Sequence, residues 1–148
     1  MITKLGRQLL EEKLLALKEE LRLTYQKRSE AAAEGDLKEN SAYIYAGEHA
    51  NLLNSQIEEI VSDLKNFIIK SNPTQFETVE FGHQVTLLYP DQRQVDFVLV
   101  GKYDARLKPN WIYYQSPIGL ALLSKKPGDQ IQINDQTITL VSISSGNI

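Results

Sequence analysis

The segment Glu34-Gly35-Asp36-Leu37-Lys38-Glu39-Asn40 separates two long stretches of helical periodicity and contains the only strong break between them. Before it, positions spaced alternately by four and three residues are Leu10, Leu14, Leu17, Leu21, Thr24, Arg28 and Ala31. After it, the same period continues at Tyr43, Ala46, Ala50, Leu53, Ile57, Ile60, Leu64 and Phe67. This alternation is typical of the a and d positions of a coiled coil. Because the connection is short, we expect two antiparallel helices whose seams face each other.

The composition of the two seams changes along the predicted hairpin. A first helix of roughly 30 residues would be about 45 Å long, at about 1.5 Å per residue. Leucines cluster at the end away from the turn, whereas the end near the turn carries Ala31, Ala32, Ala33, Ala42, Ala46 and Ala50. Small residues allow helices to approach closely, so the sequence predicts a slender rod with polar residues at its tip.

The second half of the chain has the period of β-strands. Ser71-Asn72-Pro73 is expected to end the second helix, because proline cannot continue it. Alternating apolar residues then predict strands from Thr78 onward, separated by turns at Pro90-Asp91-Gln92, 126–129 and 134–135. Residues 116–123 predict one short helix, with Ser116 as its N-cap and Pro117 in its first position.

These patterns predict an α+β chain of two domains. Residues 1–73 would form the antiparallel coiled-coil hairpin, and residues 74–148 a compact, mainly antiparallel β domain with one short helix.

Charge and composition restrict the partners. The net charge is −3, with 10 basic and 12 acidic residues before Pro73 and 6 basic and 7 acidic residues after it. Phosphate contacts supply much of the affinity for duplex DNA, so stand-alone duplex binding is not expected.

The absence of cysteine excludes disulfides and thiolate metal sites. No apolar stretch approaches the roughly 18–20 residues that span a bilayer. We expect a soluble, cytoplasmic monomer whose partner is another protein.

The acidic pair Asp36 and Glu39 has two interpretations. Carboxylates three residues apart in a first helical turn project from one side and could supply two oxygen ligands to Mg²⁺. That ion requires about six ligands, so waters, substrate phosphates or a partner would complete the site. Alternatively, Asp36 is an N-cap and Glu39 completes a capping box. Local spacing favours the cap.

Two segments resemble a known family. Gly35 to Asn40, followed by Tyr43, is similar to the tip of the bacterial GreA/GreB transcript-cleavage factors. The stretch Ser-Pro-Ile-Gly-Leu-Ala-Leu-Leu-Ser-Lys-Lys-Pro-Gly-Asp at 116–129 resembles the other hallmark of that family. Both segments lie in the expected order, and the resemblance covers essentially the whole chain.

The resemblance implies a function and a set of site residues. In the family, the coiled coil enters the secondary channel of RNA polymerase, and the acidic tip helps hold the second catalytic Mg²⁺ so that the polymerase cleaves backtracked RNA near its 3′ end. The factor stimulates the polymerase and is not an enzyme alone. Asp36 and Glu39 match the acidic pair, with Gly35, Asn40 and Tyr43 as tip support. The C-terminal domain would be FKBP-like, and Ser116, Pro117, Ile118, Gly119, Lys125 and Lys126 would dock on the polymerase.

Several positions depart from the family pattern. Ala42 replaces a commonly acidic residue, Leu120 replaces a usual Arg, and Ser124 replaces a usual Gly. Residues 46–51 lack the basic cluster of GreB-type members, which indicates either GreA-like behaviour, favouring short backtracks, or weak cleavage. Gly47, inside a predicted helix, costs about 1 kcal/mol relative to Ala.

Two other functions remain open at this level. One is a regulator that occupies the channel and inhibits RNA synthesis without promoting cleavage. The other is a helical-hairpin adaptor unrelated to polymerase, which the acidic, alanine-rich tip disfavours. His49 and His83 are expected to be surface residues, not zinc ligands, and Trp111, Tyr113 and Tyr114 to be buried or half-buried strand residues.

Overall fold

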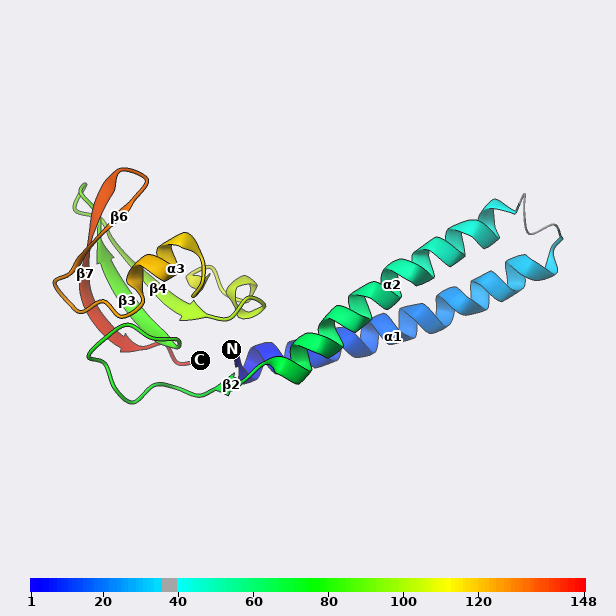
Figure 1. Ribbon diagram of the computed structural model, residues 1–148, viewed down its shortest axis with the longest axis horizontal. Coiled ribbons are helices and arrows are strands. Elements are labelled where there is room, and N and C mark those ends of the chain that lie inside the picture. Colours follow the sequence, from blue (N-terminus) through cyan, green and yellow to red (C-terminus); the bar gives the residue numbers. More distant parts are fainter. Residues whose placement is uncertain (36–39) are drawn as a thin grey trace. The chain divides into compact units, whose positions relative to one another are not determined.

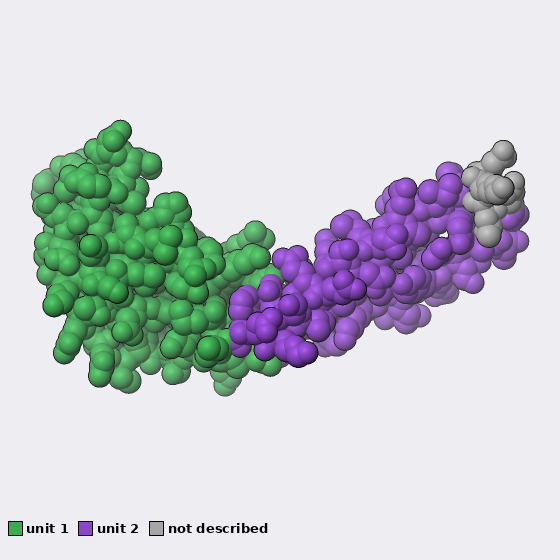
Figure 2. Space-filling model, in the orientation of Figure 1, with its two compact units in different colours: residues 1–7, 68–148 green, residues 8–67 purple. Residues whose placement is uncertain are grey.

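The computed structural model describes residues 1–35 and 40–148 and divides into two compact units. One unit contains residues 8–67, and the other contains residues 1–7 together with residues 68–148 (Figure 2). The sequence placed a single boundary at residue 73. The first seven residues instead belong to the same unit as the C-terminal half of the chain.

The first unit contains most of two long helices, α1 (Lys4–Ala33) and α2 (Ser41–Asn66), which lie side by side as a hairpin (Figure 1). Hydrogen bonds across it join Tyr25 to Asn54 and Arg28 to Tyr43, so residue numbers rise in one helix as they fall in the other. Every seam position predicted from the sequence is buried or half-buried. The predicted antiparallel coiled coil is therefore confirmed, and alanines indeed fill its buried positions near the turn.

The second helix ends earlier than predicted. It stops at Asn66, and Phe67 has extended backbone angles of φ −74° and ψ 137°. Ile69–Lys70 then form β2, which pairs in parallel with β1 (Ile2–Thr3). The prediction of helix up to residue 70 was wrong, because pairing with β1 fixes this β-branched segment as a strand, a long-range contact that local periodicity does not report.

The C-terminal part of the chain is built on a five-stranded sheet with the order β5-β4-β3-β7-β6. Its strands are β3 (His83–Leu88), β4 (Gln94–Val100), β5 (Trp111–Tyr113), β6 (Gln130–Ile133) and β7 (Gln136–Ser145). All neighbours pair antiparallel except β4 and β5, which pair in parallel. One short helix, α3 (Pro117–Leu122), and a 3-10 turn, η1 (Asp104–Arg106), complete this region. The expected fold class is confirmed.

The predicted turns and strands are placed as expected, except for the first strand. The turn after β3 has Gln92 at φ 69°, and the β6–β7 hairpin turns at Asn134 and Asp135, both with positive φ. The first strand begins at His83 and not near Thr78, because a turn at Phe81-Gly82, with Gly82 at φ 88°, interrupts the alternation.

Two apolar clusters lie in this unit. The larger packs α3 on the sheet and has as its fully buried members Val79, Val85, Leu87, Leu99, Leu122, Ile131, Ile138 and Leu140. The smaller one combines Val98 and Val100 with Trp111, which is 4% exposed. The expectation that Trp111 is a buried strand residue is confirmed. Among the described helices, none combines the length and the apolarity needed to cross a membrane.

Candidate functional site

The structure fixes both sides of the hairpin turn. On the α1 side, the Glu34 amide donates to the Ala31 carbonyl at 3.2 Å, and Gly35 adopts φ 143°, a conformation that favours glycine. A Cβ on Gly35 would meet no atom within 4 Å, so its backbone angle, not crowding, requires glycine. Asp36 and Glu39, the predicted acidic pair, lie outside the described residues, and their metal-binding role stays a prediction.

On the α2 side, Asn40 is the residue that organises the turn. Its side-chain Oδ1 accepts from the Tyr43 amide at 3.1 Å, which makes Asn40 the N-cap of α2. Its Nδ2 donates to the Ala31 carbonyl at 2.6 Å, across the hairpin. From the sequence, Asp36 was one candidate for the cap of this helix, and Asp36 lies outside the described residues. In the described part of the chain, α2 begins at Ser41 and Asn40 supplies the capping oxygen.

Arg28 occupies a seam position where an apolar residue is usual, and it packs on the aromatic residue of the tip motif. Its guanidinium donates to the Tyr43 hydroxyl at 2.9 Å and lies 4.8 Å from the centre of the Tyr43 ring. The Nε atom of Arg28 is buried and has no hydrogen-bond partner.

Gly47 lies beside Arg28. A Cβ on Gly47 would lie 3.7 Å from Arg28 Nε, an ordinary van der Waals distance, so this contact does not require glycine. The side chains of Arg28 and Tyr43 fill the seam just below the turn.

Farther along the hairpin, His49 joins the two helices. Its Nε2 lies 3.0 Å from Glu20 Oε1, and its ring stacks on Tyr45 with an interplanar angle of 8°. Across residues 1–35 and 40–148, no group of three or more His, Cys, Asp or Glu side chains is arranged to hold a metal ion.

The predicted C-terminal docking segment forms α3 and the turns around it. Ser116 Oγ accepts from the Gly119 amide at 3.2 Å, and Pro117 takes the first helical position, both as predicted. Ile118 packs against the larger apolar cluster. A Cβ on Gly119 would overlap the Tyr113 and Tyr114 carbonyl oxygens, so only glycine fits there. Ser116, Ile118 and Gly119 are thus needed for the local fold, whatever else they do.

The exposed residues of this segment are those available to a partner. Pro117, Lys125 and Lys126 are exposed, and Leu120 exposes 58% of its surface. The turn that follows is closed by Asp129, whose Oδ2 accepts from the Lys126 amide at 2.8 Å. Docking through these residues remains a prediction.

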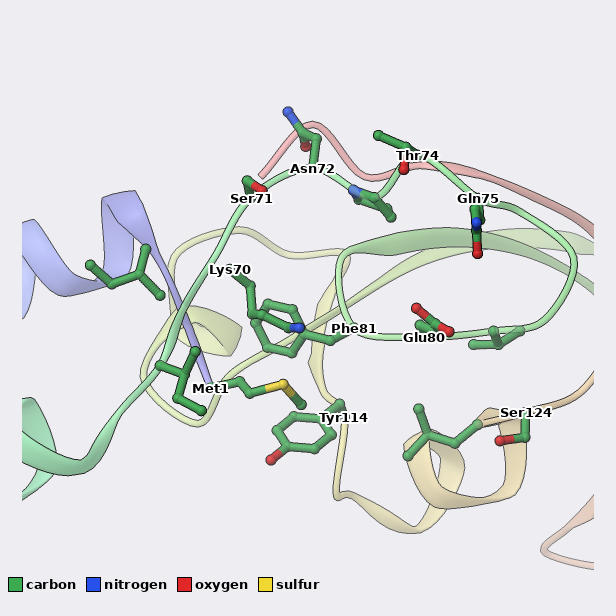
Figure 3. A pocket seen from close by; sticks show the side chains of 15 residues that line it. Met1, Lys70, Ser71, Asn72, Thr74, Gln75, Glu80, Phe81, Tyr114 and Ser124 are labelled. Carbon is green, nitrogen blue, oxygen red and sulfur yellow. The ribbon is translucent and has the colours of Figure 1, made fainter.

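A pocket of about 750 Å³ borders the same segment at Tyr114, Leu123 and Ser124 (Figure 3). Phe81 and Tyr114 pack edge to face, with ring centres 5.6 Å apart. The side chains of Met1 and Lys70 extend toward these two rings (Figure 3). The pocket therefore combines aromatic faces with a cation, beside residues that the sequence assigns to docking.

The second histidine was misjudged from the sequence. His83 is completely buried, not a surface residue. Its Nδ1 accepts from the Glu80 amide at 2.9 Å, so its Nε2 carries the proton that is donated to the Gln75 carbonyl at 2.7 Å. His83 therefore ties the segment before β3 to the sheet, a role that no local sequence signal indicates.

Two models of known protein families match this chain. A family model described as "Transcription elongation factor, N-terminal" matches residues 1–69, and one described as "Transcription elongation factor, GreA/GreB, C-term" matches residues 73–145. The chain belongs to the GreA/GreB family.

Relatives within this family cover most of the chain. Transcription elongation factor GreA of Novosphingobium aromaticivorans is 35% identical over 133 residues, which cover 86% of this chain and 82% of that protein. GreA of Orientia tsutsugamushi strain Ikeda is 37% identical over 136 residues, covering 89% and 85%. A solved structure, GreA factor homolog 1 of Thermus thermophilus, is 22% identical, covers 97% of each chain and has a TM-score of 0.45. The family assignment rests on the sequence matches.

Within the family pattern, the departure at Ser124 has a structural consequence. Ser124 adopts φ 65°, in the left-handed region where the family's glycine would be unstrained. The Ser124 amide donates to the Val79 carbonyl at 2.9 Å. The left-handed conformation therefore strains the serine that stands in this turn.

Proposed function

We propose that this GreA/GreB family protein inserts its coiled coil into the secondary channel of RNA polymerase and stimulates Mg²⁺-dependent cleavage of backtracked RNA. The observation that carries the proposal is the hairpin itself. Two long helices share a continuous seam, with alanines in its buried positions near the turn, and in the sequence Asp36 and Glu39 lie between them. The protein acts on the activity of the polymerase and has no nuclease activity alone.

The fixed flanks of the turn support this role. Asn40 binds the end of α1 through the Ala31 carbonyl, and Arg28 holds Tyr43 in the first turn of α2. Asp36 and Glu39 follow Gly35 and precede Asn40 in the sequence. A catalytic group must be positioned closely to act, so anchored flanks favour a role for the segment that they enclose.

The chemistry of the acidic pair suits a shared metal site. Two carboxylates provide fewer than the roughly six ligands that Mg²⁺ requires, so Asp36 and Glu39 would act only beside ligands from the polymerase and the RNA. When bound, the metal would lower the pKa of a coordinated water and so supply the nucleophile. The two carboxylates would raise metal occupancy and orient this water toward the transcript.

The C-terminal domain would recruit the factor at the channel entrance. Pro117, Lys125 and Lys126 are exposed around α3, as a docking surface requires. Leu120 replaces the Arg that is usual in the family, so this contact would be less electrostatic than in most relatives.

A backtracked elongation complex with end-labelled RNA tests the proposal. Purified protein and Mg²⁺ are expected to shorten the transcript from its 3′ end. Asp36→Asn and Glu39→Gln preserve shape but remove the charge, and each is expected to lower the cleavage rate by at least roughly tenfold, a loss typical of removing one catalytic group. Binding to core polymerase, measured separately, should change little.

Glu34→Gln provides the matched control, because Glu34 is an exposed acidic residue of the same turn outside the proposed pair. It should retain cleavage. Undiminished cleavage by the Asp36→Asn/Glu39→Gln double variant would refute the assignment. Inhibition of RNA synthesis without cleavage products would instead identify a non-cleaving channel regulator.

A further inference from the structure

Asp104 is a completely buried carboxylate that takes no part in the proposed cleavage chemistry. It lies in η1, between β4 and β5, 100 residues after Lys4, the first residue of α1. Its Oδ2 accepts from the Thr3 amide and from the Gly101 amide, each at 3.0 Å. Its Oδ1 accepts from the Thr3 hydroxyl at 2.5 Å. One carboxylate thus receives three hydrogen bonds from two distant parts of the chain.

Thr3 extends this network into the first turn of α1. Its Oγ1 donates to Asp104 and accepts from the Gly6 amide at 2.9 Å, the bond that an N-cap residue makes to the third helical position. Asp104 therefore fixes the hydroxyl that caps the helix. A negative charge close to a helix N-terminus also interacts favourably with the helix dipole.

Two glycines provide the space that this carboxylate occupies. A Cβ on Gly6 would fall on Asp104 Oδ1, and a Cβ on Gly101 would lie 2.7 Å from Asp104 Oδ2. Neither glycine has a positive φ, so close approach explains both. Thr3, Gly6, Gly101 and Asp104, here called the root cluster, are packed around one charge.

The root cluster lies where the hairpin starts. Residues 1–7, which include the first turn of α1, belong to the same compact unit as Asp104, whereas the rest of α1 belongs to the hairpin unit. The single helix α1 is continuous across this boundary. The hydrogen bonds of Asp104 therefore hold the one helical turn that α1 shares with the C-terminal part of the chain.

We propose that Asp104 is a positioning residue, which holds the first turn of α1 and thereby stiffens the root from which the hairpin extends. The stiffness of the root does not depend on the proposed function. The effect of that stiffness on cleavage, through the position of the tip, does rest on the proposed function. A loose root would leave docking intact but spread the acidic tip over more orientations, and poorly oriented catalytic groups act slowly.

Amide hydrogen exchange tests the root cluster in the free, full-length protein. In Asp104→Asn, the Thr3, Gly6 and Gly101 amides should lose protection by roughly 10- to 100-fold, as expected when a charged acceptor of buried donors is weakened. The amides of β3 and β7 should keep their protection. Unchanged exchange at Thr3, Gly6 and Gly101, or equal loss throughout the sheet, would overturn the proposal.

The matched control is another Thr–Asp pair in the same unit. Thr86 Oγ1 donates to Asp96 Oδ1 at 2.7 Å, but this pair is exposed on the sheet. Asp96→Asn should leave the root amides unchanged.

Spin labels measure the stiffness directly. The chain has no cysteine, so Glu58→Cys in α2 and Gln130→Cys in β6, both exposed positions, can be labelled specifically. The distribution of distances between the two labels should broaden clearly in Asp104→Asn and Thr3→Val, and remain as in the parent protein in Asp96→Asn. An equally narrow distribution in Asp104→Asn would refute the proposal.

The cleavage assay separates positioning from folding. For Asp104→Asn, the concentration that gives half-maximal cleavage should stay within about twofold, while the maximal rate falls by roughly tenfold. A mutation that only unfolds part of the protein would raise the half-maximal concentration and leave the maximal rate unchanged. That result for Asp104→Asn would contradict a positioning role. If the parent protein promotes no cleavage, the proposed function fails, whereas the exchange and spin-label results still decide the role of Asp104.

Discussion

Asn40 and Ala31 are joined across the hairpin turn by a hydrogen bond of 2.6 Å, from the Asn40 side-chain nitrogen to the Ala31 carbonyl oxygen. Ala31 is in the last turn of α1 and Asn40 caps α2, so this one side chain closes the hairpin from both sides. The oxygen of the same amide group holds the Tyr43 amide. Replacements of Asn40 can therefore separate the cap from the bridge.

Asn40→Ala removes both interactions, and Asn40→Asp keeps the cap acceptor but removes the donor to Ala31. We expect Asn40→Ala to lower the free energy of unfolding of the hairpin by about 1–2 kcal/mol, through loss of the cap and the bridge. Asn40→Asp should lose roughly half as much. Urea unfolding followed by circular dichroism measures both. Equal losses in the two variants would show that the bridge alone matters.

Arg28→Met is expected to be neutral or stabilising in the free protein. The guanidinium is half-buried in the seam with an unpartnered Nε, and an apolar side chain of similar length avoids that desolvation cost. Thermal unfolding measures the effect. Tyr43→Phe, which removes the hydroxyl that Arg28 binds, should instead destabilise by about 1 kcal/mol. Strong destabilisation by Arg28→Met would show that the Tyr43 contact outweighs the cost of burying Arg28.

Gly47→Ala should stabilise α2 by up to about 1 kcal/mol. Alanine has the higher helix propensity, and its Cβ would meet Arg28 Nε at 3.7 Å, an ordinary van der Waals distance. Urea unfolding of the variant tests this. A lower free energy of unfolding would mean that the Arg28 side chain cannot accept even this contact.

Ser124→Gly should raise the free energy of unfolding by roughly 0.5–1 kcal/mol. The left-handed conformation at φ 65° strains a serine but not a glycine, and the relief exceeds the extra entropy of the unfolded chain. Gly128→Ala is the opposite control: Gly128 has φ 94° and open space around it, so the variant should destabilise through strain alone. A Ser124→Gly protein less stable than its parent would contradict this account.

Tyr114 should ionise at a higher pH in the folded protein than an ordinary tyrosine does. Burial raises the pKa of Tyr114 above its ordinary value of 10.0, and the neighbouring Tyr113 raises it further. The pKa of Tyr114 is higher in the folded than in the unfolded state. Its ionisation therefore leaves the free energy of unfolding unchanged below about pH 10 and lowers it as the pH rises above that value. The ultraviolet absorbance of phenolate follows the titration, and Tyr114→Phe should remove a late component.

The hairpin could be predicted from the sequence because its contacts repeat locally. The seam residues lie three or four positions apart, from Leu10 to Ala31 and from Tyr43 to Leu64. This spacing places them on one face of each helix, so the local pattern alone predicts which face is buried. The α3 helix could be predicted for the same reason, because the residues that mark its start, Ser116 and Pro117, are adjacent in the sequence. The sequence predicted that Asn40 lies at the tip. It did not predict that Asn40 caps α2, because Asp36 has an equally good local pattern for a cap.

Contacts distant in sequence could not be predicted in this way. Ile2–Thr3 pairs with Ile69–Lys70, and His83 is buried beneath the segment that contains Gln75. Nothing within a few residues of His83 distinguishes it from a surface histidine. Its hydrogen bonds form only once the chain has returned over it.

By itself the sequence determined the two long helices, the break between them, the strand-rich second half and, through its motifs, the family. Only the tertiary structure decided that Asp104 anchors the start of α1, that Asn40 closes the turn and that Gly6 and Gly101 must lack side chains. The physical reason is range: periodicity and capping act over a few residues, whereas a buried carboxylate is defined by donors that folding brings from 101 residues away.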